Sequence, residues 1–320
     1  MRERYVGSSP CARSASTMRQ DGAALLLAML TLALMAGLAA FVVADYGAAA
    51  ELLVGRQDQN QSRWLARAAV DWARNVLSED KHTNDFDYLG EAWATHVAPT
   101  AVEDGEVSGE ITDYSGYFNL NSLVANGQAD KNQVEVYKRL LAQLGLPSQQ
   151  STALASALVD WLDTNNKAEE GGAETEWYVA QGRRYQVANG LLVDVDELRL
   201  IRGYDDDLVD RLRPFVAALP ETAPLNVNTA SPEVLAASIA NLGIDEARAL
   251  ATKRQVAPFQ AVPDFNSQLP AKATVQSSIS VSSRYFLVAG RAKYGQAVTR
   301  MQVLLDRASP WSKIVWQKIL

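Results

Sequence analysis

The hydrophobic pattern of the N-terminal quarter indicates one long helix. No charged residue occurs from Ala23 to Ala44, a length that matches the ~20 apolar residues a helix needs to cross a bilayer core. From Ala48 to Leu77 there is no proline, and apolar residues recur at helical spacing. These residues are Leu52, Leu53, Trp64, Leu65, Ala68, Ala69, Trp72 and Val76. We predict a single helix over residues 23–77, transmembrane over 23–44 and amphipathic beyond.

The pattern of the rest of the chain predicts strands near both ends and helices between them. Residues 106–113 alternate weakly, as a strand does, and residues 284–293 and 297–306 are strand-like around a turn. Residues 314–316 suit a last edge strand. The intervening stretch, residues 80–104, is predicted as a loop with Trp93 as its buried residue.

The middle of the chain predicts helices joined by glycine turns. Three apolar helices end at Gly145, Gly203 and Gly243, and glycine can take the left-handed conformation at a helix end. The fold class predicted is α+β, a long N-terminal helix packed on a small antiparallel sheet and interrupted by an all-α insertion of helix-hairpin-helix or SAM-like type. The predicted domains are a leader (1–22), the helix (23–77), an αβ domain (78–119 and 272–320) and a helical insertion (120–271).

Composition and charge exclude several classes of function. The formal net charge of −7 argues against general attraction to nucleic acid or anionic lipid. Cys11 is the single cysteine, so no intrachain disulfide can form. His82 and His96 are the only histidines, which leaves little for catalytic zinc or a histidine-based triad. No glycine-rich phosphate loop, nucleophile elbow or His–Glu metal motif is present, so we expect no enzyme.

The basic leader predicts the orientation of the apolar segment. Four arginines against two acidic residues precede it, which places the N-terminus in the cytoplasm and the remainder outside. An ordinary signal anchor fits the same pattern. A removed secretory signal is a second alternative, since Ala48, Ala49 and Ala50 offer small residues for cleavage, although the apolar run exceeds the usual core of a signal peptide. Translation could begin at Met1 or at Met18.

Several motifs resemble one known family. Residues 19–22 (RQDG) before the apolar run resemble the cleavage site of type IV prepilin-like proteins. The further motifs follow in order: 113–123 (DYSGYFNLNSL), 160–163 (DWLD), Tyr185, 189–190 (NG), 196–198 (DEL) and 225–230 (LNVNTA). Together they look like minor pseudopilin K of type II secretion systems, also called general secretion pathway protein K.

The resemblance implies both processing and role. It implies that a prepilin peptidase cuts between Gly22 and Ala23 and that Ala23 is N-methylated. It also implies a structural subunit at the tip of a pseudopilus, which helps to initiate and cap the filament that drives folded proteins across the outer membrane. The implied partners are minor pseudopilins of the I and J types, contacted through the N-terminal helices. The implied location is the bacterial inner membrane with the C-terminal domain in the periplasm.

One position departs from ordinary pilins. Most have a glutamate fifth after the cut, where this chain has Leu27. A carboxylate in hydrocarbon is costly unless it is paired, and its expected partner in pilins is the N-terminal ammonium of a neighbour. A subunit at the tip has no neighbour beyond it, so Leu27 agrees with that position.

An acidic stretch predicts a cation site. Asp160 and Asp163 lie three residues apart at the end of a predicted helix that residues 164–166 should terminate, and a glycine-bearing loop then leads to Glu174. Hard oxygen ligands without His or Cys suit Ca²⁺ better than zinc or copper. The family also implies calcium in this insertion, which we assign to Asp160, Asp163, Asn165 and Glu174, with Glu170 as a further candidate.

The main alternative is a membrane-anchored DNA-binding or DNA-uptake protein. Residues 226–233 and the Gly243 hairpin resemble helix-hairpin-helix modules, which hold a phosphate with backbone amides. Asp245 and Glu246 follow this glycine directly and would repel a phosphate, so no nucleic acid is expected as a partner. Ser231 should instead cap the helix that begins at Pro232.

Overall fold

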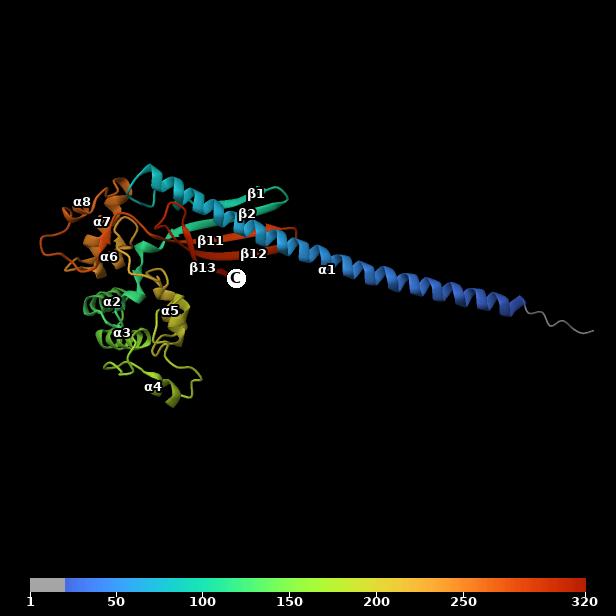
Figure 1. The fold of residues 1–320 in the computed structure, drawn as a ribbon, viewed down its shortest axis with the longest axis horizontal. Coiled ribbons are helices and arrows are strands. Elements are labelled where there is room, and N and C mark those ends of the chain that lie inside the picture. Colours follow the sequence, from blue (N-terminus) through green and yellow to red (C-terminus); the bar gives the residue numbers. More distant parts are fainter. Residues whose placement is uncertain (1–20) are drawn as a thin grey trace, which may run out of the picture. The chain divides into compact units, whose positions relative to one another are not determined.

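A computed structural model of the chain describes residues 21–320, and its first element is the long helix α1, Asp21–Thr83 (Figure 1). The contacts divide the chain into two units, residues 1–57 and 58–320. In the first unit the apolar side chains from Leu25 to Val43 are exposed, and α1 is long and apolar enough to cross a membrane. The helix is continuous past the predicted end at residue 77. Most of the predicted leader, including Cys11, lies outside the described residues.

A five-stranded antiparallel sheet forms the centre of the second unit. The strand order is β1-β2-β11-β12-β13, with β1 Val97–Val102, β2 Gly105–Asp113, β11 Tyr285–Tyr294, β12 Ala297–Asp306 and β13 Lys313–Ile319. The four strands expected from the sequence are present. The prediction of a loop over residues 80–104 was wrong in part, because β1 and a 3₁₀ turn at Ala92–Ala94 lie within it.

The amphipathic half of α1 packs across one face of this sheet (Figure 1). Ala66, Val70, Ala73 and Leu77 form the buried stripe of the helix, at spacings of three and four residues. They meet apolar side chains of β11 and β12, and Trp93 packs edge-on against Phe286 at 5.2 Å between ring centroids. The prediction that Trp93 is buried is confirmed, since it is 1% exposed.

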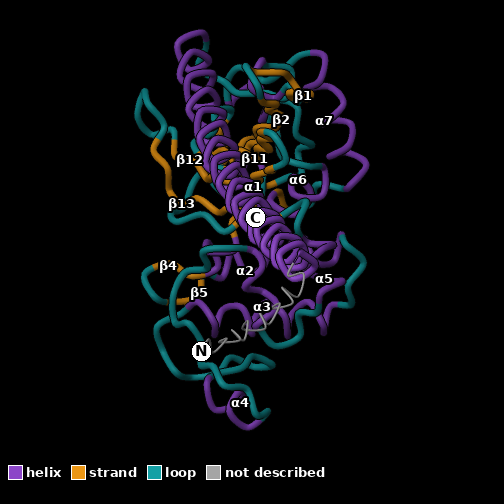
Figure 2. Tube along the Cα trace, turned by 90° about the vertical axis from the view of Figure 1, so that its right-hand side faces the viewer, coloured by secondary structure: helices purple, strands orange, loops and turns teal. Residues whose placement is uncertain are grey.

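The helical insertion lies between β2 and β11 in sequence, and its larger core is separate from that beneath α1. In Figure 2, α2 to α4 form a group apart from the strands of the sheet. The helices are α2 Lys131–Gln143, α3 Ser148–Leu162, α4 Thr175–Ala180, α5 Asp206–Leu212, α6 Pro232–Ser238, α7 Ile244–Val256 and α8 Val262–Asn266. Short strands and 3₁₀ turns connect them: β3 Phe118–Asn119, β4 Val124–Ala125, β5 Gln128–Ala129, β6 Val216–Ala217, β7 Leu225–Asn226, β8 Ile239–Ala240, β9 Thr274–Val275, β10 Ile279–Ser280, and turns at Tyr114–Gly116, Leu120–Leu123 and Val195–Leu200.

Two related Asn-X-Asn motifs begin two halves of this insertion. β3 pairs in parallel with β6, and β7 pairs in parallel with β10. After β3, Asn121 exchanges hydrogen bonds with the backbone N–H and C=O of Leu192, at 2.8 and 2.9 Å. After β7, Asn228 makes the same pair of bonds with Phe259, at 2.9 and 2.8 Å. The insertion is therefore built from two halves. In each half the side-chain amide of a buried asparagine bonds to both the N–H and the C=O of one residue, as the backbone of a neighbouring strand would.

The three predicted glycine turns are not equivalent. Gly145 and Gly203 have φ of +84° and +88°, so they take the left-handed conformation as expected. The prediction was wrong for Gly243, which has φ −72° and is the N-cap of α7. Asn241 takes the left-handed position there instead, with φ 62°, because the turn after β8 reverses two residues earlier. The cap predicted at Ser231 is confirmed, since its side chain accepts from Val234 N–H.

Candidate functional site

Three acidic side chains are buried around the loop that follows α3. Asp160 lies in the last turn of α3 and Asp163 is its C-cap, so the helix ends where the sequence predicted. Glu174 is the N-cap of α4, at the other end of the loop. Their exposed fractions are 0%, 1% and 7%. Carboxylates this deeply buried normally need a cationic partner.

No lysine or arginine of the described residues forms an ion pair with these three groups. Asp160 Oδ1 accepts from Glu169 N–H at 3.0 Å, but Asp160 Oδ2 and both oxygens of Glu174 have no hydrogen-bond partner. Burial raises the pKa of all three groups, and the neighbouring carboxylates raise it further. The arrangement thus offers uncompensated hard oxygen atoms, which is the chemistry of a Ca²⁺ ligand set.

The loop backbone packs directly against Asp160. Gly172 lies so close that a Cβ there would stand 2.0 Å from Asp160 Oδ2. The guanidinium of Arg202 donates to the Gly172 carbonyl at 2.7 Å and stacks on Trp177. Arg202 therefore anchors the loop without touching the carboxylates.

The other predicted ligands are placed less favourably. Asn165 is exposed, its amide donates to Asp163 Oδ2 at 2.8 Å, and its oxygen accepts from Lys167 N–H. Glu170 is exposed. Asn189, which the sequence did not suggest as a ligand, has a buried Oδ1 without a partner and bonds to Asn166 of the same loop. The structure thus buries Asp160, Asp163 and Glu174 around one loop, without bringing oxygen atoms of all three within 4.8 Å of one another, and gives no special position to Glu170.

A second acidic group was not predicted from the sequence. Among the described residues, Asp80, Asp87 and Glu91 bring carboxylate oxygens within 4.8 Å of one another. Here a cation is already supplied, because buried Arg307 pairs with Asp80 at 2.9 Å and with Asp87. Glu91 accepts from Trp93 Nε1 at 2.7 Å. This group joins the end of α1 to the end of β12 as an internal ion-pair network rather than a metal site.

Asp113 joins the sheet to the insertion. It is the last residue of β2, and its Oδ2 accepts from Thr229 Oγ1 and Ser283 Oγ, each at 2.5 Å. Asn226 Nδ2 donates to the same oxygen at 3.2 Å. Burial raises the pKa of Asp113 to about 6, while the hydroxyl donors oppose that rise. The first asparagine of the second Asn-X-Asn motif is therefore part of the junction between the two parts of the fold.

Comparison with known proteins gives a consistent result. Two family models, both described as Type II secretion system (T2SS), protein K, match residues 116–221 and 225–282. The chain is 36% identical over 297 residues to Type II secretion system protein K of Pseudomonas aeruginosa, covering 90% of this chain and 88% of that one. The chain belongs to the type II secretion system protein K family. The protein K of Klebsiella pneumoniae is 35% identical, covering 87% of this chain and 91% of its own.

The fold of the family is also matched. A chain in the crystal structure of the GspK-GspI-GspJ complex from the enterotoxigenic Escherichia coli type 2 secretion system superposes with a TM-score of 0.74. It is 24% identical, and the match covers 84% of this chain and 99% of that chain. The two protein K family models coincide with the two halves of the helical insertion, each of which begins at an Asn-X-Asn motif.

The structure gives no support to DNA binding by this protein K family member. The backbone N–H of Gly243, which a phosphate would need, donates to Glu246 Oε2 at 2.7 Å. At the preceding hairpin the Asp205 side chain accepts a hydrogen bond from the backbone N–H of Leu208. Both candidate phosphate positions are therefore filled by carboxylates from the chain itself.

The residues predicted for processing lie at the start of α1. Gly22, Ala23 and Leu27 are all in the helix, and their side chains or backbone are exposed. The structure places the candidate cut within the first two turns, before the apolar segment. Cleavage and methylation stay predictions.

Proposed function

We propose that this chain is a minor pseudopilin at the tip of the type II secretion pseudopilus, where it helps to initiate and cap the filament. Its membership of the protein K family is the observation that carries the proposal. The related solved structure is a complex that contains GspI and GspJ. The partners proposed for this chain are accordingly minor pseudopilins of the I and J types.

The anchor supports assembly from the membrane. α1 supplies a segment that can span the inner membrane, with the remainder of the chain in the periplasm. Leu27 occupies the position at which other pilins have a glutamate that pairs with the N-terminal ammonium of a neighbouring subunit. A subunit at the tip has no neighbour beyond it, so it does not need that carboxylate. The bulk of the helical insertion would oppose stacking of another subunit above.

Processing after Gly22 provides the first test. The mature protein should begin at N-methylated Ala23, because only then can α1 leave the membrane and join other helices. Intact-mass and N-terminal peptide analysis of membrane-extracted protein measures this, alongside co-purified I- and J-type subunits. A mature chain that retains Gly22, in cells with an active prepilin peptidase, would contradict the proposal.

A calcium ion at the loop after α3 is part of the same proposal. Asp160, Asp163 and Glu174 would hold it, with Asn165 and Glu170 as the remaining candidates from the sequence. When bound, Ca²⁺ neutralises the buried carboxylates and ties the end of α3 to the start of α4. The orphaned oxygens of Asp160 and Glu174 support the assignment.

Calcium removal tests this assignment separately from secretion. At a calcium concentration ~100 times the Kd, binding adds about 2.7 kcal/mol to the free energy of unfolding, which raises Tm by roughly 5–10 °C for a domain of this size. Chelation should reverse that shift, and magnesium should not replace calcium. An unchanged Tm after chelation would remove calcium from the account.

The proposed role is structural, without catalysis. Each group of buried acidic residues is given a structural role in this proposal. Asp160, Asp163 and Glu174 form a cation site, Asp80, Asp87 and Glu91 belong to an ion-pair network, and Asp113 lies at a domain junction. Protein export in cells that carry loop variants should follow assembly of the complex rather than any turnover by the purified chain.

A further inference from the structure

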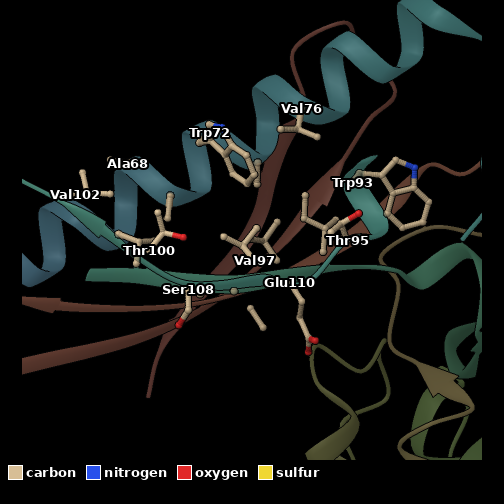
Figure 3. A pocket seen from close by; sticks show the side chains of 18 of the residues that line it. Ala68, Trp72, Val76, Trp93, Thr95, Val97, Thr100, Val102, Ser108 and Glu110 are labelled. Carbon is tan, nitrogen blue, oxygen red and sulfur yellow. The ribbon is translucent and has the colours of Figure 1, made fainter. Parts of the chain in front are cut away.

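Apolar and polar binding features lie in different parts of the structure. An apolar groove of about 530 Å³ runs between α1 and the strands β1 and β2, and Figure 3 shows Trp72 facing Val97 across it. The only carboxylate in its lining is that of Glu110, which points away from the groove (Figure 3). The buried carboxylate oxygens that lack hydrogen-bond partners belong instead to Asp160 and Glu174, around the loop after α3. The chemistry that can hold a cation is therefore found at that loop.

Glu174 is the candidate ligand that regular structure fixes least. Asp160 lies in the last turn of α3 and Asp163 is its C-cap, so a helix of 15 residues places both. Glu174 follows an irregular stretch and begins α4, which has only 6 residues. Neither of its carboxylate oxygens has a hydrogen-bond partner. Contacts other than those of its own carboxylate must therefore hold this residue in place.

Arg202 holds the chain on both sides of Glu174. Its Nη1 donates to the carbonyl oxygen of Gly172, two residues before Glu174, at 2.7 Å. Its guanidinium stacks on the ring of Trp177, three residues after Glu174, at 4.8 Å from the ring centroid. The backbone N–H of Arg202 donates to the Tyr178 hydroxyl at 3.1 Å. These three contacts tie the segment from residue 172 to residue 178 to one arginine.

The turn that carries Arg202 is itself fixed on α3. Gly203 has φ +88° and lies so close to Leu154 of α3 that a Cβ there would stand 3.0 Å from Leu154 Cδ2. The Tyr204 hydroxyl donates to the Leu154 carbonyl at 3.1 Å. A left-handed glycine against the helix and a buried hydrogen bond leave this turn little freedom. Arg202 therefore connects the Glu174 segment to the helix that carries the other two candidate ligands.

The charge of Arg202 opposes the binding of a cation nearby. A positive group close to the site repels Ca²⁺, and the donor of Arg202 is used on a backbone carbonyl rather than on a carboxylate. If Arg202 acted through its charge alone, its removal would tighten calcium binding. Any gain in affinity that it provides must come from the position it gives to the loop.

We propose that Arg202 is the positioning residue of the calcium site and holds the backbone on both sides of Glu174 against α3 before the ion binds. The inference rests on the proposed function, which supplies the calcium ion. A ligand that is already in place loses less conformational freedom when it binds. Groups that orient metal ligands without touching the metal typically change its affinity by roughly 10–100-fold.

Calcium titration of the full-length chain in detergent tests the proposal. Arg202→Met removes the guanidinium and keeps an unbranched side chain that can lie on Trp177. Isothermal titration calorimetry should show a Kd for calcium at least tenfold above that of the unmodified chain. The matched control is Arg211→Met, because Arg211 also donates to a backbone carbonyl of the insertion, that of Leu144 at the end of α2. Its Kd should stay within twofold of the unmodified value.

Hydrogen exchange in the chelated protein gives a readout without calcium. Arg202→Met should speed amide exchange at least tenfold in peptides that cover residues 169–178, because the segment then opens locally. Peptides from β11 and β12 should exchange at the unmodified rate. Arg211→Met should leave exchange in residues 169–178 unchanged.

The variants must be folded for this comparison, which circular dichroism and the Tm of the chelated proteins measure. If Arg202→Met does not fold, Trp177→Leu takes its place. It removes the stacking partner and leaves the bond from Arg202 to Gly172, so the Kd should rise at least threefold.

Three outcomes overturn the positioning role while the unmodified chain still binds calcium. These are a folded Arg202→Met with a Kd within twofold of the unmodified value, a variant that binds calcium more tightly, and an equal loss of affinity in Arg211→Met. If the unmodified chain binds no calcium, the calcium part of the proposed function fails, and this inference fails with it.

Discussion

Gly172 and Asp160 are in such close contact that the loop after α3 tolerates no side chain at position 172. A Cβ there would stand 2.0 Å from Asp160 Oδ2 and 2.8 Å from its Cγ. The same oxygen is one of those left without a hydrogen-bond partner. The glycine therefore keeps the loop closed over a carboxylate that the protein itself does not satisfy.

Gly172→Ala should abolish the calcium-dependent rise in Tm. The added methyl group must displace either the loop or the carboxylate, so the ligand oxygens no longer converge. The control is Gly190→Ala, because a Cβ at position 190 meets Ala188 O at an ordinary 3.6 Å. Differential scanning calorimetry with calcium and with chelator measures both. Retention of a full calcium response in Gly172→Ala would show that the loop does not form the site.

Asp160→Asn should have opposite effects in the two states of the site. Without calcium it removes one of several mutually repelling buried charges, so the chelated variant should be more stable than the chelated parent protein. With calcium it loses a ligand, so affinity should fall at least tenfold. Glu176→Gln, at an exposed position near the same loop, is the control and should change neither state. Calorimetric titration measures the calcium affinity, and thermal unfolding measures the stability of the chelated protein. An Asp160→Asn variant that is less stable than the parent protein under chelation would contradict the charge argument.

The junction at Asp113 predicts a specific dependence on pH. Its folded-state pKa is raised to about 6 by burial, and that of Asp80 is also raised to about 6, first by burial and then by Glu91 and Asp87. Because an unfolded aspartate titrates near 3.9, the folded state holds the extra protons between about pH 4 and pH 6. These groups therefore make the folded state less stable as pH rises through that window, and their contribution is constant outside it.

Asp113→Asn isolates this contribution. The free energy of unfolding of the parent protein minus that of the variant should decrease from pH 4 to pH 6 and level off above. The control is Asp85→Asn, which removes an exposed carboxylate. Urea unfolding at each pH measures both differences, and a difference for Asp113→Asn that does not change with pH would remove the raised pKa from the account.

The two Asn-X-Asn motifs should be equally important for stability. Asn228→Ala leaves the N–H and C=O of Phe259 unpaired in the core, which should cost roughly 2–4 kcal/mol, and Asn121→Ala does the same to Leu192. Asn132→Ala, at an exposed position of α2, should stay within about 0.5 kcal/mol. Denaturant unfolding tests all three. If either core variant matched Asn132→Ala, the two-unit description of the insertion would be wrong.

Long, regular elements could be predicted from the sequence because their pattern is local. The 3.6-residue period marks α1, and apolar residues on both sides of a Tyr-Gly-Gln turn mark β11 and β12. β1 escaped prediction because Pro99 interrupts it and its residues are largely exposed, so it lacks both alternation and an apolar run. The left-handed residue of the third hairpin was misplaced because Asn241, rather than the glycine, makes the turn.

The candidate sites show the same division between local and distant information. Asp160 and Asp163 share a helix end, so their proximity followed from spacing alone. Arg307 could not be connected to Asp80 and Asp87 from the sequence, since more than 200 positions separate them and only the sheet brings them together. The bonds from Asp113 to Thr229 and Ser283 cross from one part of the fold to the other in the same way.

Counting copies of this chain in isolated filaments of known length tests the central claim most directly. A tip subunit is present once per filament, so the ratio of this chain to the main filament subunit should fall in inverse proportion to filament length. Quantitative mass spectrometry with isotope-labelled peptides, on filaments sorted by length, measures that ratio. A constant ratio across lengths would mean that the chain is built in along the whole filament, and the account of a capping subunit would be wrong.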